Sequence, residues 1–315
     1  MARLTRTTRF TGAGRLSWSE LRHSGNWLYL IPALIFFIGY QIYPIIQVAL
    51  ISFTDYHYVR NDPINFIGLQ NYSNAIADPV IWQGLGRAAI FTAMFLPGTI
   101  IVPLFLAILI DRVRSSRLGS IYRLILLIPA VIPGPMIFML WKWLYDFEIG
   151  PINNLLINGL HLFTFRTAPQ WLGNSALSLP AIAVMEVWWG LGYHTMFFLA
   201  GLASIPHELF EAARIDGANE WKMFWHVTLP RLRPIMLILV VLRFGSAMAV
   251  IDEYLIMGGG FKRTLPTYTW TVYMWDLAFK LGDWFQGYAA AIGWIGAGVM
   301  LVVVIGMFYI LRNRD

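Results

Sequence analysis

The chain has 315 residues, of which 58% are hydrophobic and only 13% are charged, and its formal net charge at pH 7 is +6. Because soluble domains usually carry about a quarter charged residues, this composition argues against a soluble globular protein. The basic balance does not indicate nucleic-acid binding, which would need basic residues interleaved with stacking aromatics on a soluble face. The absence of cysteine excludes disulfides and thiolate metal sites.

The first 26 residues read as a basic tail. They carry five arginines against one glutamate, and no short apolar run with a small-residue cleavage site follows them. We therefore expect no cleaved signal peptide, and a first apolar span that remains as a membrane anchor.

Six stretches are apolar and long enough, or nearly so, to cross a bilayer, which takes about 20 residues. Backbone polar groups inside lipid must be paired within the segment, so the sequence predicts an all-α membrane protein. One transmembrane domain over 27–311 would contain all six helices. The predicted spans cover 27–53, 88–110, 121–141, 176–203, 235–256 and 287–311.

Lysine and arginine in short loops indicate which loops face the cytoplasm. Basic residues are frequent in the N-terminal tail, in the loop after the second span, at the C-terminus and in the loop 204–234. The loops on the other side are poorer in them. The sequence thus predicts a multi-pass protein with both termini and the 204–234 loop in the cytoplasm.

Charged residues inside spans are rare and suggest functional sites. Glu186 lies in the fourth span and Arg243 in the fifth, with Asp252 and Glu253 at the outer end of the fifth. A Glu186–Arg243 pair would be structural, whereas unpaired side chains could line a pathway. The sequence leaves both possibilities open.

The loop 204–234 is charged and broken by turn residues, which a protein does not need in order to sit in lipid. Pro206 suits the first turn of a helix over 206–216, and Gly217 is a natural helix stop because it can adopt positive φ. Asn219 can cap a second helix. On these residues alone, an interfacial amphipathic loop and a docking element are about equally supported.

A motif in this loop carries a family resemblance. The motif begins with Glu211-Ala212-Ala213, continues after three residues with Gly217, and ends after nine more with Val227-Thr228-Leu229-Pro230. It resembles the EAA loop of ABC-importer permeases, with valine for the usual isoleucine. The stretches 66–82, 122–156 and 252–260 also resemble the carbohydrate-importer members of that family. Gly260 departs from the family pattern, which more often has proline there.

The resemblance implies a type I ABC importer in a bacterial or archaeal cytoplasmic membrane. This chain and a second permease subunit would form the pathway, a dimer of cytoplasmic ATPases would bind ATP and Mg, and an extracytoplasmic binding protein would deliver a sugar. The chain itself would be non-catalytic, without metal or cofactor, and it contains no phosphate-binding G-x-x-x-x-G-K-[ST] motif. The residues expected to couple to the ATPase are Glu211, Ala212, Ala213, Asp216, Gly217, Leu229 and Pro230.

Sugars stack on aromatic faces and hydrogen-bond to polar side chains, so Glu186, Trp189, Tyr193 and Asp252 are the predicted pathway residues. The aromatic residues could equally be interface anchors. The alternative cargo is glycerol 3-phosphate or another polyol, although an anionic cargo would need more cationic pathway residues than Arg243 alone.

Overall fold

The computed structural model describes residues 27–59, 63–113, 115–280 and 285–312. The predicted basic tail over 1–26 lies outside these residues. The described residues contain no β-strand, only an isolated antiparallel bridge between Thr54 and Phe66. The expected all-helical class is therefore confirmed for this part of the chain.

The chain divides into two compact units, and the smaller one ends at Leu50. Its described part is an almost unbroken helix made of α2 (Trp27–Phe37), a π-helical turn η1 (Ile38–Ile42) and α3 (Tyr43–Ile51). Large apolar side chains along it are exposed, as expected for a helix that meets lipid or another protein rather than its own core.

The larger unit, 51–315, contains the remaining helices. They are α4 (Gln70–Ala77), α5 (Pro79–Asp111), α6 (Ser116–Val131), α7 (Gly134–Leu144), α8 (Pro151–Asn154), η2 (Leu155–Gly159), α9 (Ser178–Ala203), α10 (His207–Ile215), α11 (Glu220–Met223), η3 (Phe224–Thr228), α12 (Leu229–Met248), α13 (Asp252–Met257), α14 (Trp270–Phe279) and α15 (Gln286–Arg312).

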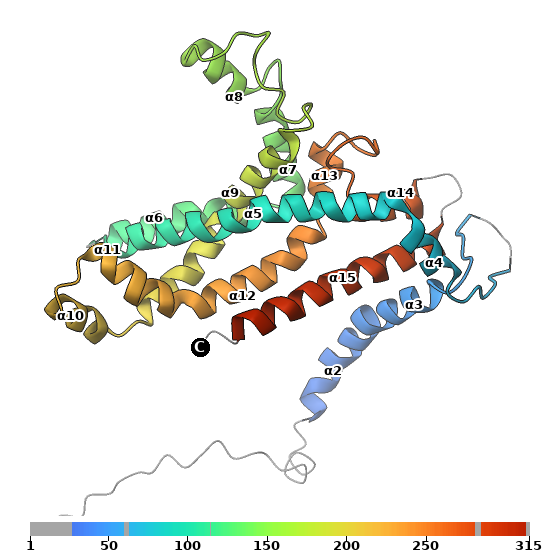
Figure 1. The fold of residues 1–315 in the computed structure, drawn as a ribbon, viewed down its shortest axis with the longest axis horizontal. Coiled ribbons are helices and arrows are strands. Elements are labelled where there is room, and N and C mark those ends of the chain that lie inside the picture. Colours follow the sequence, from blue (N-terminus) through green and yellow to red (C-terminus); the bar gives the residue numbers. More distant parts are fainter. Residues whose placement is uncertain (1–26, 60–62, 114, 281–284, 313–315) are drawn as a thin grey trace, which may run out of the picture. The chain divides into compact units, whose positions relative to one another are not determined.

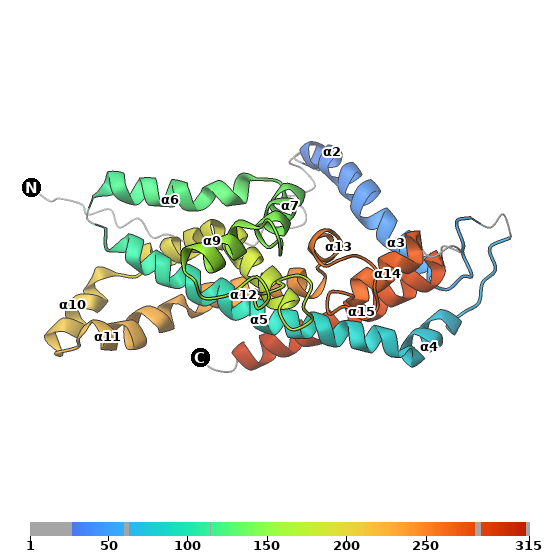
Figure 2. The ribbon, with the colours of Figure 1, turned by 90° about the horizontal axis from the view of Figure 1, so that it is seen from above.

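Helix α9 is central to the packing of this unit, because it contacts α5, α6 and α12. Helix α14 packs between α5 and α15, and α15 also contacts α4. Within this unit, α10 and α11 lie at one end of the long helices, and α4 and α14 lie at the other end (Figure 1, Figure 2). We call these two ends of the unit the α10–α11 end and the α4–α14 end.

Helix α5 begins nine residues before the predicted span over 88–110. The Asp78 carboxylate accepts a hydrogen bond from the Val80 amide at 2.9 Å, and Pro79 occupies the first helical turn. Both residues favour a helix start at this point. Pro97 and Pro103 lie inside α5, which continues through both of them.

The predicted span over 121–141 is not one continuous helix. It is divided into α6 and α7, which meet at an angle of 95°. Pro133 lies in the break, and it can neither donate a backbone hydrogen bond nor continue the preceding helix without a clash. The predicted span over 235–256 is also broken, since α12 ends at Met248 and α13 starts at Asp252.

Among the described residues, three helical segments are long and apolar enough to cross a membrane, and the bent pair α6–α7 could make a fourth. The three are Tyr29–Ile51, Pro79–Asp111 and Gln286–Tyr309. The prediction of six spans thus stays a prediction.

Candidate functional site

The 204–234 loop folds into two short helices joined at Gly217. Helix α10 begins at His207, with Pro206 in an extended conformation just before it. At its end, the amide of Gly217 bonds to the Arg214 carbonyl at 3.0 Å, and the amide of Ala218 bonds to the Ala213 carbonyl at 2.9 Å. This pair of bonds is the Schellman arrangement, which needs positive φ at the glycine position. Gly217 has φ of 75°, which confirms the predicted helix stop.

The second helix begins at the predicted cap. The side-chain oxygen of Asn219 accepts a hydrogen bond from the Lys222 amide at 2.9 Å. Helix α11 then passes through the π-helical turn η3 directly into α12, whose first turn contains Leu229 and Pro230. Because no loop separates η3 from α12, a force on α11 would act directly on the start of α12.

The surface of this segment is unusual for a charged loop because it exposes large apolar side chains. Ile215 is 86% exposed and Trp221 is 68% exposed. The Trp225 ring packs edge-on against Trp221, with centroids 5.6 Å apart, and is also exposed. We call Ile215, Trp221 and Trp225 the exposed apolar group. Ile215 was not among the candidate residues named from the sequence. A large apolar residue at the end of a charged helix could have indicated an exposed apolar side chain there.

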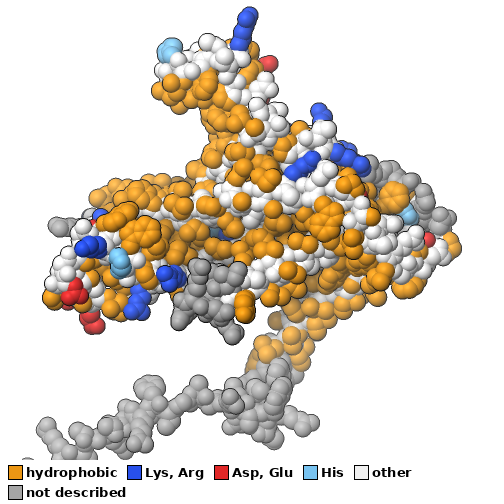
Figure 3. Space-filling view, viewed as in Figure 1, with side chains coloured by type: hydrophobic (Ala, Val, Ile, Leu, Met, Phe, Trp, Pro, Cys, Tyr) orange, Lys and Arg blue, Asp and Glu red, His pale blue; other side chains and the backbone are white. Residues whose placement is uncertain are grey.

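The structure separates the predicted coupling residues into two sets. Glu211, Ala212, Asp216 and Gly217 are exposed, and Ala213 is half-buried on the same helix end. Leu229 and Pro230 are half-buried at the start of α12. Charged side chains gather over this end of the molecule, whereas hydrophobic side chains dominate the surface of the long helices (Figure 3).

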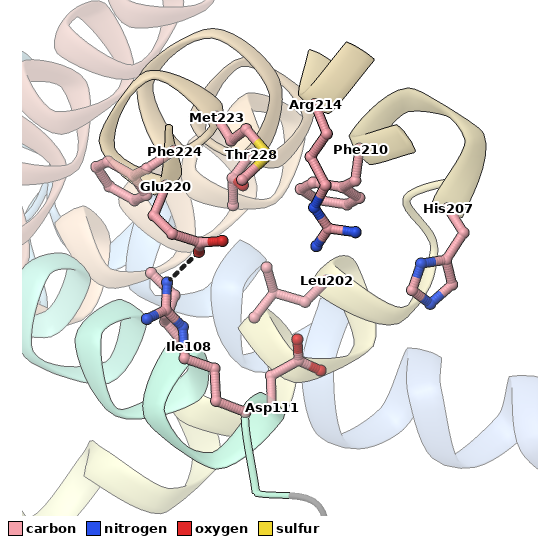
Figure 4. A pocket seen from close by; sticks show the side chains of 11 residues that line it. Ile108, Asp111, Leu202, His207, Phe210, Arg214, Glu220, Met223, Phe224 and Thr228 are labelled. Carbon is pink, nitrogen blue, oxygen red and sulfur yellow. Dashed lines mark hydrogen bonds and ion pairs between the residues drawn. The ribbon is translucent and has the colours of Figure 1, made fainter. Parts of the chain in front are cut away.

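A cavity of about 210 Å³ lies between this loop and the end of α5 (Figure 4). An ion pair crosses one side of it, from Nη2 of Arg112, the residue directly after α5, to Glu220 Oε2 on α11 at 2.8 Å. Both side chains are well exposed, so the pair contributes little stability, on the order of 0–1 kcal/mol. The other lining residues are Ile108, Asp111, Leu202, His207, Phe210, Arg214, Met223, Phe224 and Thr228.

The charged residues within the predicted spans form a second cluster. Arg243 on α12 donates from Nε to His194 Nε2 on α9 at 2.6 Å. A guanidinium has no acceptor, so His194 Nε2 must accept, and the imidazole is neutral with its proton on Nδ1. The described residues show no ion pair between Arg243 and Glu186, so the structural pairing considered above is not formed.

Glu186 instead faces another carboxyl group. It is only 8% exposed, and it interacts electrostatically with Glu253 on α13. One Glu186 oxygen, Oε1, is buried without a partner. Glu253 was noted in the sequence only as a charge near the membrane interface, and its electrostatic interaction with Glu186 could not be foreseen there.

The four predicted pathway residues do not share one surface. Glu186 is buried, and Trp189 is half-buried with its ring edge-on to Phe138 at 5.5 Å. Tyr193 is 50% exposed, and Asp252 is exposed at the start of α13. We call the exposed residues Tyr193 and Asp252 the outer pair, and the less exposed residues Glu186 and Trp189 the inner pair.

A family model matches residues 99–314, and its description is "Binding-protein-dependent transport system inner membrane component". A probable ABC transporter permease protein of Pyrococcus horikoshii is 31% identical, over 90% of this chain and 94% of that protein. The sulfoquinovosyl glycerol transport system permease protein of Agrobacterium fabrum is 28% identical, over 91% of this chain and 90% of that protein. The arabinooligosaccharides transport system permease protein of Bacillus subtilis is 29% identical, over 93% and 91%.

The fold is also found among solved structures. One chain in the crystal structure of a bacterial ABC transporter that imports the acidic polysaccharide alginate superposes with a TM-score of 0.78 at 24% identity. The match covers 95% of this chain and 99% of that chain.

Proposed function

The chain belongs to the family of binding-protein-dependent transport system inner membrane components, and we propose that it forms half of the translocation pathway for a sugar or oligosaccharide. It is a permease subunit of an ABC importer and a multi-pass membrane protein, not an enzyme, and it has the type I importer fold. The resemblance stated from the EAA motif is thereby confirmed at the level of the family.

The cargo proposal is supported by relatives that cover nearly the whole chain. Two of those named above belong to transport systems for sulfoquinovosyl glycerol and arabinooligosaccharides, and a further relative, 30% identical, belongs to a diacetylchitobiose uptake system of Streptomyces coelicolor. None of these relatives is described as a permease for glycerol 3-phosphate. Arg243, the cation of the fifth predicted span, already donates from Nε to His194.

The exposed apolar group carries the coupling proposal. Large apolar side chains that protrude into water mark sites of protein contact. Ile215, Trp221 and Trp225 protrude on both sides of the Gly217 cap, next to the exposed carboxylates of Glu211 and Asp216. A dimer of cytoplasmic ATPases, which would bind ATP and Mg²⁺, would dock on this surface and move α12 through the continuous α11–η3–α12 segment.

The proposed topology has six spans with both termini in the cytoplasm. The three long apolar segments supply three spans, α9 supplies another, and the broken pairs α6–α7 and α12–α13 supply the last two. A second permease would complete the pathway opposite the outer pair, Tyr193 and Asp252, which are exposed on this subunit. Glu186 and Trp189 would support that lining from behind. An extracytoplasmic binding protein would deliver the sugar at the α4–α14 end.

The experiment is to purify the tagged chain gently from its native membrane and to identify the proteins that accompany it. We expect a second permease and an ATPase, and an ATPase rate that rises with a saccharide plus its binding protein but not with glycerol 3-phosphate. Ile215→Asp should reduce the recovered ATPase, because it places a charge at the proposed contact.

Ile76→Asp is the matched control, because Ile76 is an exposed isoleucine on α4, at the opposite end of the unit. It should leave recovery of the ATPase unchanged. Recovery of this chain alone, even after crosslinking through 206–226, would overturn the coupling proposal. Stimulation by glycerol 3-phosphate alone would overturn the sugar proposal.

A further inference from the structure

A cavity of about 380 Å³, separate from the one described above, lies where the end of α7 and the end of α13 are close together. Helices α7 and α13 pack against each other, which brings the chain segments that follow them side by side. The volume falls within the range of about 300–1,000 Å³ that is typical of sites for small molecules. The segments that line the cavity follow the third and fifth predicted spans, and the proposed topology places both outside the cytoplasm.

One residue that lines this cavity, Trp171, is held in place by a buried amide. Trp171 Nε1 donates to Asn153 Oδ1 at 2.9 Å, and Asn153 is only 1% exposed. Asn153 Nδ2 donates in turn to the carbonyl of Phe147 at 3.2 Å and to that of Pro169 at 3.1 Å. The Asn153 amide thus ties the indole ring to two segments of chain that border the cavity.

The protein covers only part of the Trp171 ring. Tyr145 packs against it with ring centroids 5.7 Å apart, and the Tyr145 hydroxyl is itself fixed, because it donates to the Ala181 carbonyl on α9 at 3.0 Å. Trp171 nevertheless remains half-buried and lines the cavity. Aromatic rings offer a large apolar contact area of fixed geometry, on which the C–H face of a sugar ring can pack.

Three polar side chains that line the cavity have hydrogen-bonding atoms to spare. Asp146 Oδ1 accepts from the amides of Glu148 and Ile149, whereas Oδ2 has no partner within the described part of the chain. The Lys142 ammonium and the Gln170 amide also have none there, and both side chains are exposed. Sugar hydroxyls can donate to a carboxylate and accept from an ammonium or amide group. The one positive and one negative charge balance, which suits a neutral saccharide.

We propose that this cavity is a saccharide subsite on the outer side of the subunit. One sugar ring packs on Trp171, and its hydroxyls bind Lys142, Asp146 and Gln170. The subsite receives the sugar before it enters the pathway between the two permeases, so this inference rests on the proposed function. It is distinct from the outer pair, because neither residue of that pair lines the cavity.

The test is saturation-transfer NMR on the purified wild-type complex, with maltotriose, arabinotriose and diacetylchitobiose as probes. We expect binding of at least one of them. Trp171→Ala should raise the Kd of that saccharide at least about tenfold, because the apolar contact surface is lost. Trp82→Ala is the matched control and should leave the Kd unchanged. Trp82 is also an exposed tryptophan whose Nε1 donates within the chain, to the Ile76 carbonyl at 2.8 Å, but it does not line the cavity.

Two further variants keep the test independent of how Trp171→Ala folds. Lys142 and Gln170 have exposed side chains, so Lys142→Ala and Gln170→Ala should fold like the wild type and raise the Kd about two- to tenfold each. A Kd that both variants leave unchanged would overturn the subsite, whatever Trp171→Ala does. Binding of none of the three probes to the wild type would also overturn it.

Failure of the subsite and failure of the proposed function give different results. If only the subsite is wrong, a saccharide with its binding protein still stimulates the wild-type ATPase, and Trp171→Ala, Lys142→Ala and Gln170→Ala leave that stimulation and the Kd unchanged. If the proposed function is wrong, no saccharide stimulates the wild-type ATPase at all.

Discussion

The Asp78 carboxylate begins one helix and holds two others. Its Oδ1 accepts from the Val80 amide at the start of α5. Its Oδ2 accepts from Tyr273 OH on α14 at 2.8 Å and from Tyr288 OH on α15 at 3.1 Å. One residue thereby fixes the relative positions of three helices at the α4–α14 end.

Asp78→Ala should destabilise the protein by about 2–4 kcal/mol. The loss combines a helix cap, worth about 1 kcal/mol, with two hydrogen bonds to a charged group that leave tyrosine hydroxyls unpaired. The readout is the midpoint of thermal unfolding, followed by tryptophan fluorescence in detergent. Asp146→Ala is the control, because the Asp146 carboxylate accepts from the nearby amides of Glu148 and Ile149 and joins no other helix among the described residues. Equal midpoints for the two variants would show that Asp78 does not join the three helices.

At the residue scale, the sequence predicted features that depend on neighbouring residues, such as helix ends. It did not predict which side chains from distant segments contact each other. The positive φ of Gly217 and the cap at Asn219 follow from the conformational freedom of glycine and the short amide side chain of asparagine, and both are confirmed. The Arg243–His194 hydrogen bond joins residues 49 positions apart. The sequence shows that charged side chains within a membrane span carry an energetic cost. It does not determine which side chains form hydrogen bonds with each other.

At the scale of elements, α6 and α9 approach each other closely at a glycine. A Cβ atom placed on Gly192 would lie 2.1 Å from the Leu126 backbone oxygen of α6. A backbone atom cannot turn aside as a flexible side chain can, so any larger residue must push the two helices apart. Small residues at helix crossings serve the same purpose in other membrane proteins.

Gly192→Ala should cost at least about 1–3 kcal/mol through overpacking. Gly86→Ala should be neutral or slightly stabilising, because no atom lies within 4 Å of a Cβ atom at that exposed position of α5. The measurement is again the unfolding midpoint of the two purified variants. The close approach would be refuted if both alanines gave the same midpoint.

The prolines show why helix breaks were hard to foresee. Pro97 and Pro103 lie within α5, which runs on through both, whereas Pro133 lies at the 95° break between α6 and α7. Each proline removes one backbone hydrogen bond. Whether the helix then continues or turns depends on what packs beside it, which composition and hydropathy do not report.

At the scale of the whole molecule, the Gly217 cap decides how α10 is set relative to α11. Space is not the constraint, since no atom lies within 4 Å of a Cβ atom built at Gly217. Conformation is the constraint, because φ of 75° is strained for a β-branched residue but tolerated by asparagine.

Gly217→Val should leave the protein in the membrane but lower the amount of cargo transported per ATP hydrolysed, whereas Gly217→Asn should retain most of the coupling. The measurement is uptake and ATP hydrolysis in the same proteoliposomes. Normal coupling in the valine variant would mean that the angle between α10 and α11 does not transmit force. An equal loss in both variants would assign the defect to side-chain bulk at the docking surface.

The exposed apolar group also has a consequence for the life of the subunit in a cell. On the proposed docking, Ile215, Trp221 and Trp225 would be covered only when a partner binds, so a copy made in excess would leave two tryptophans and an isoleucine in water. Exposed apolar surface of this kind is what chaperones and quality-control proteases bind. The surface proposed to receive force in the assembled importer would therefore mark an unassembled subunit for removal, and the amount of permease would follow the supply of its partner.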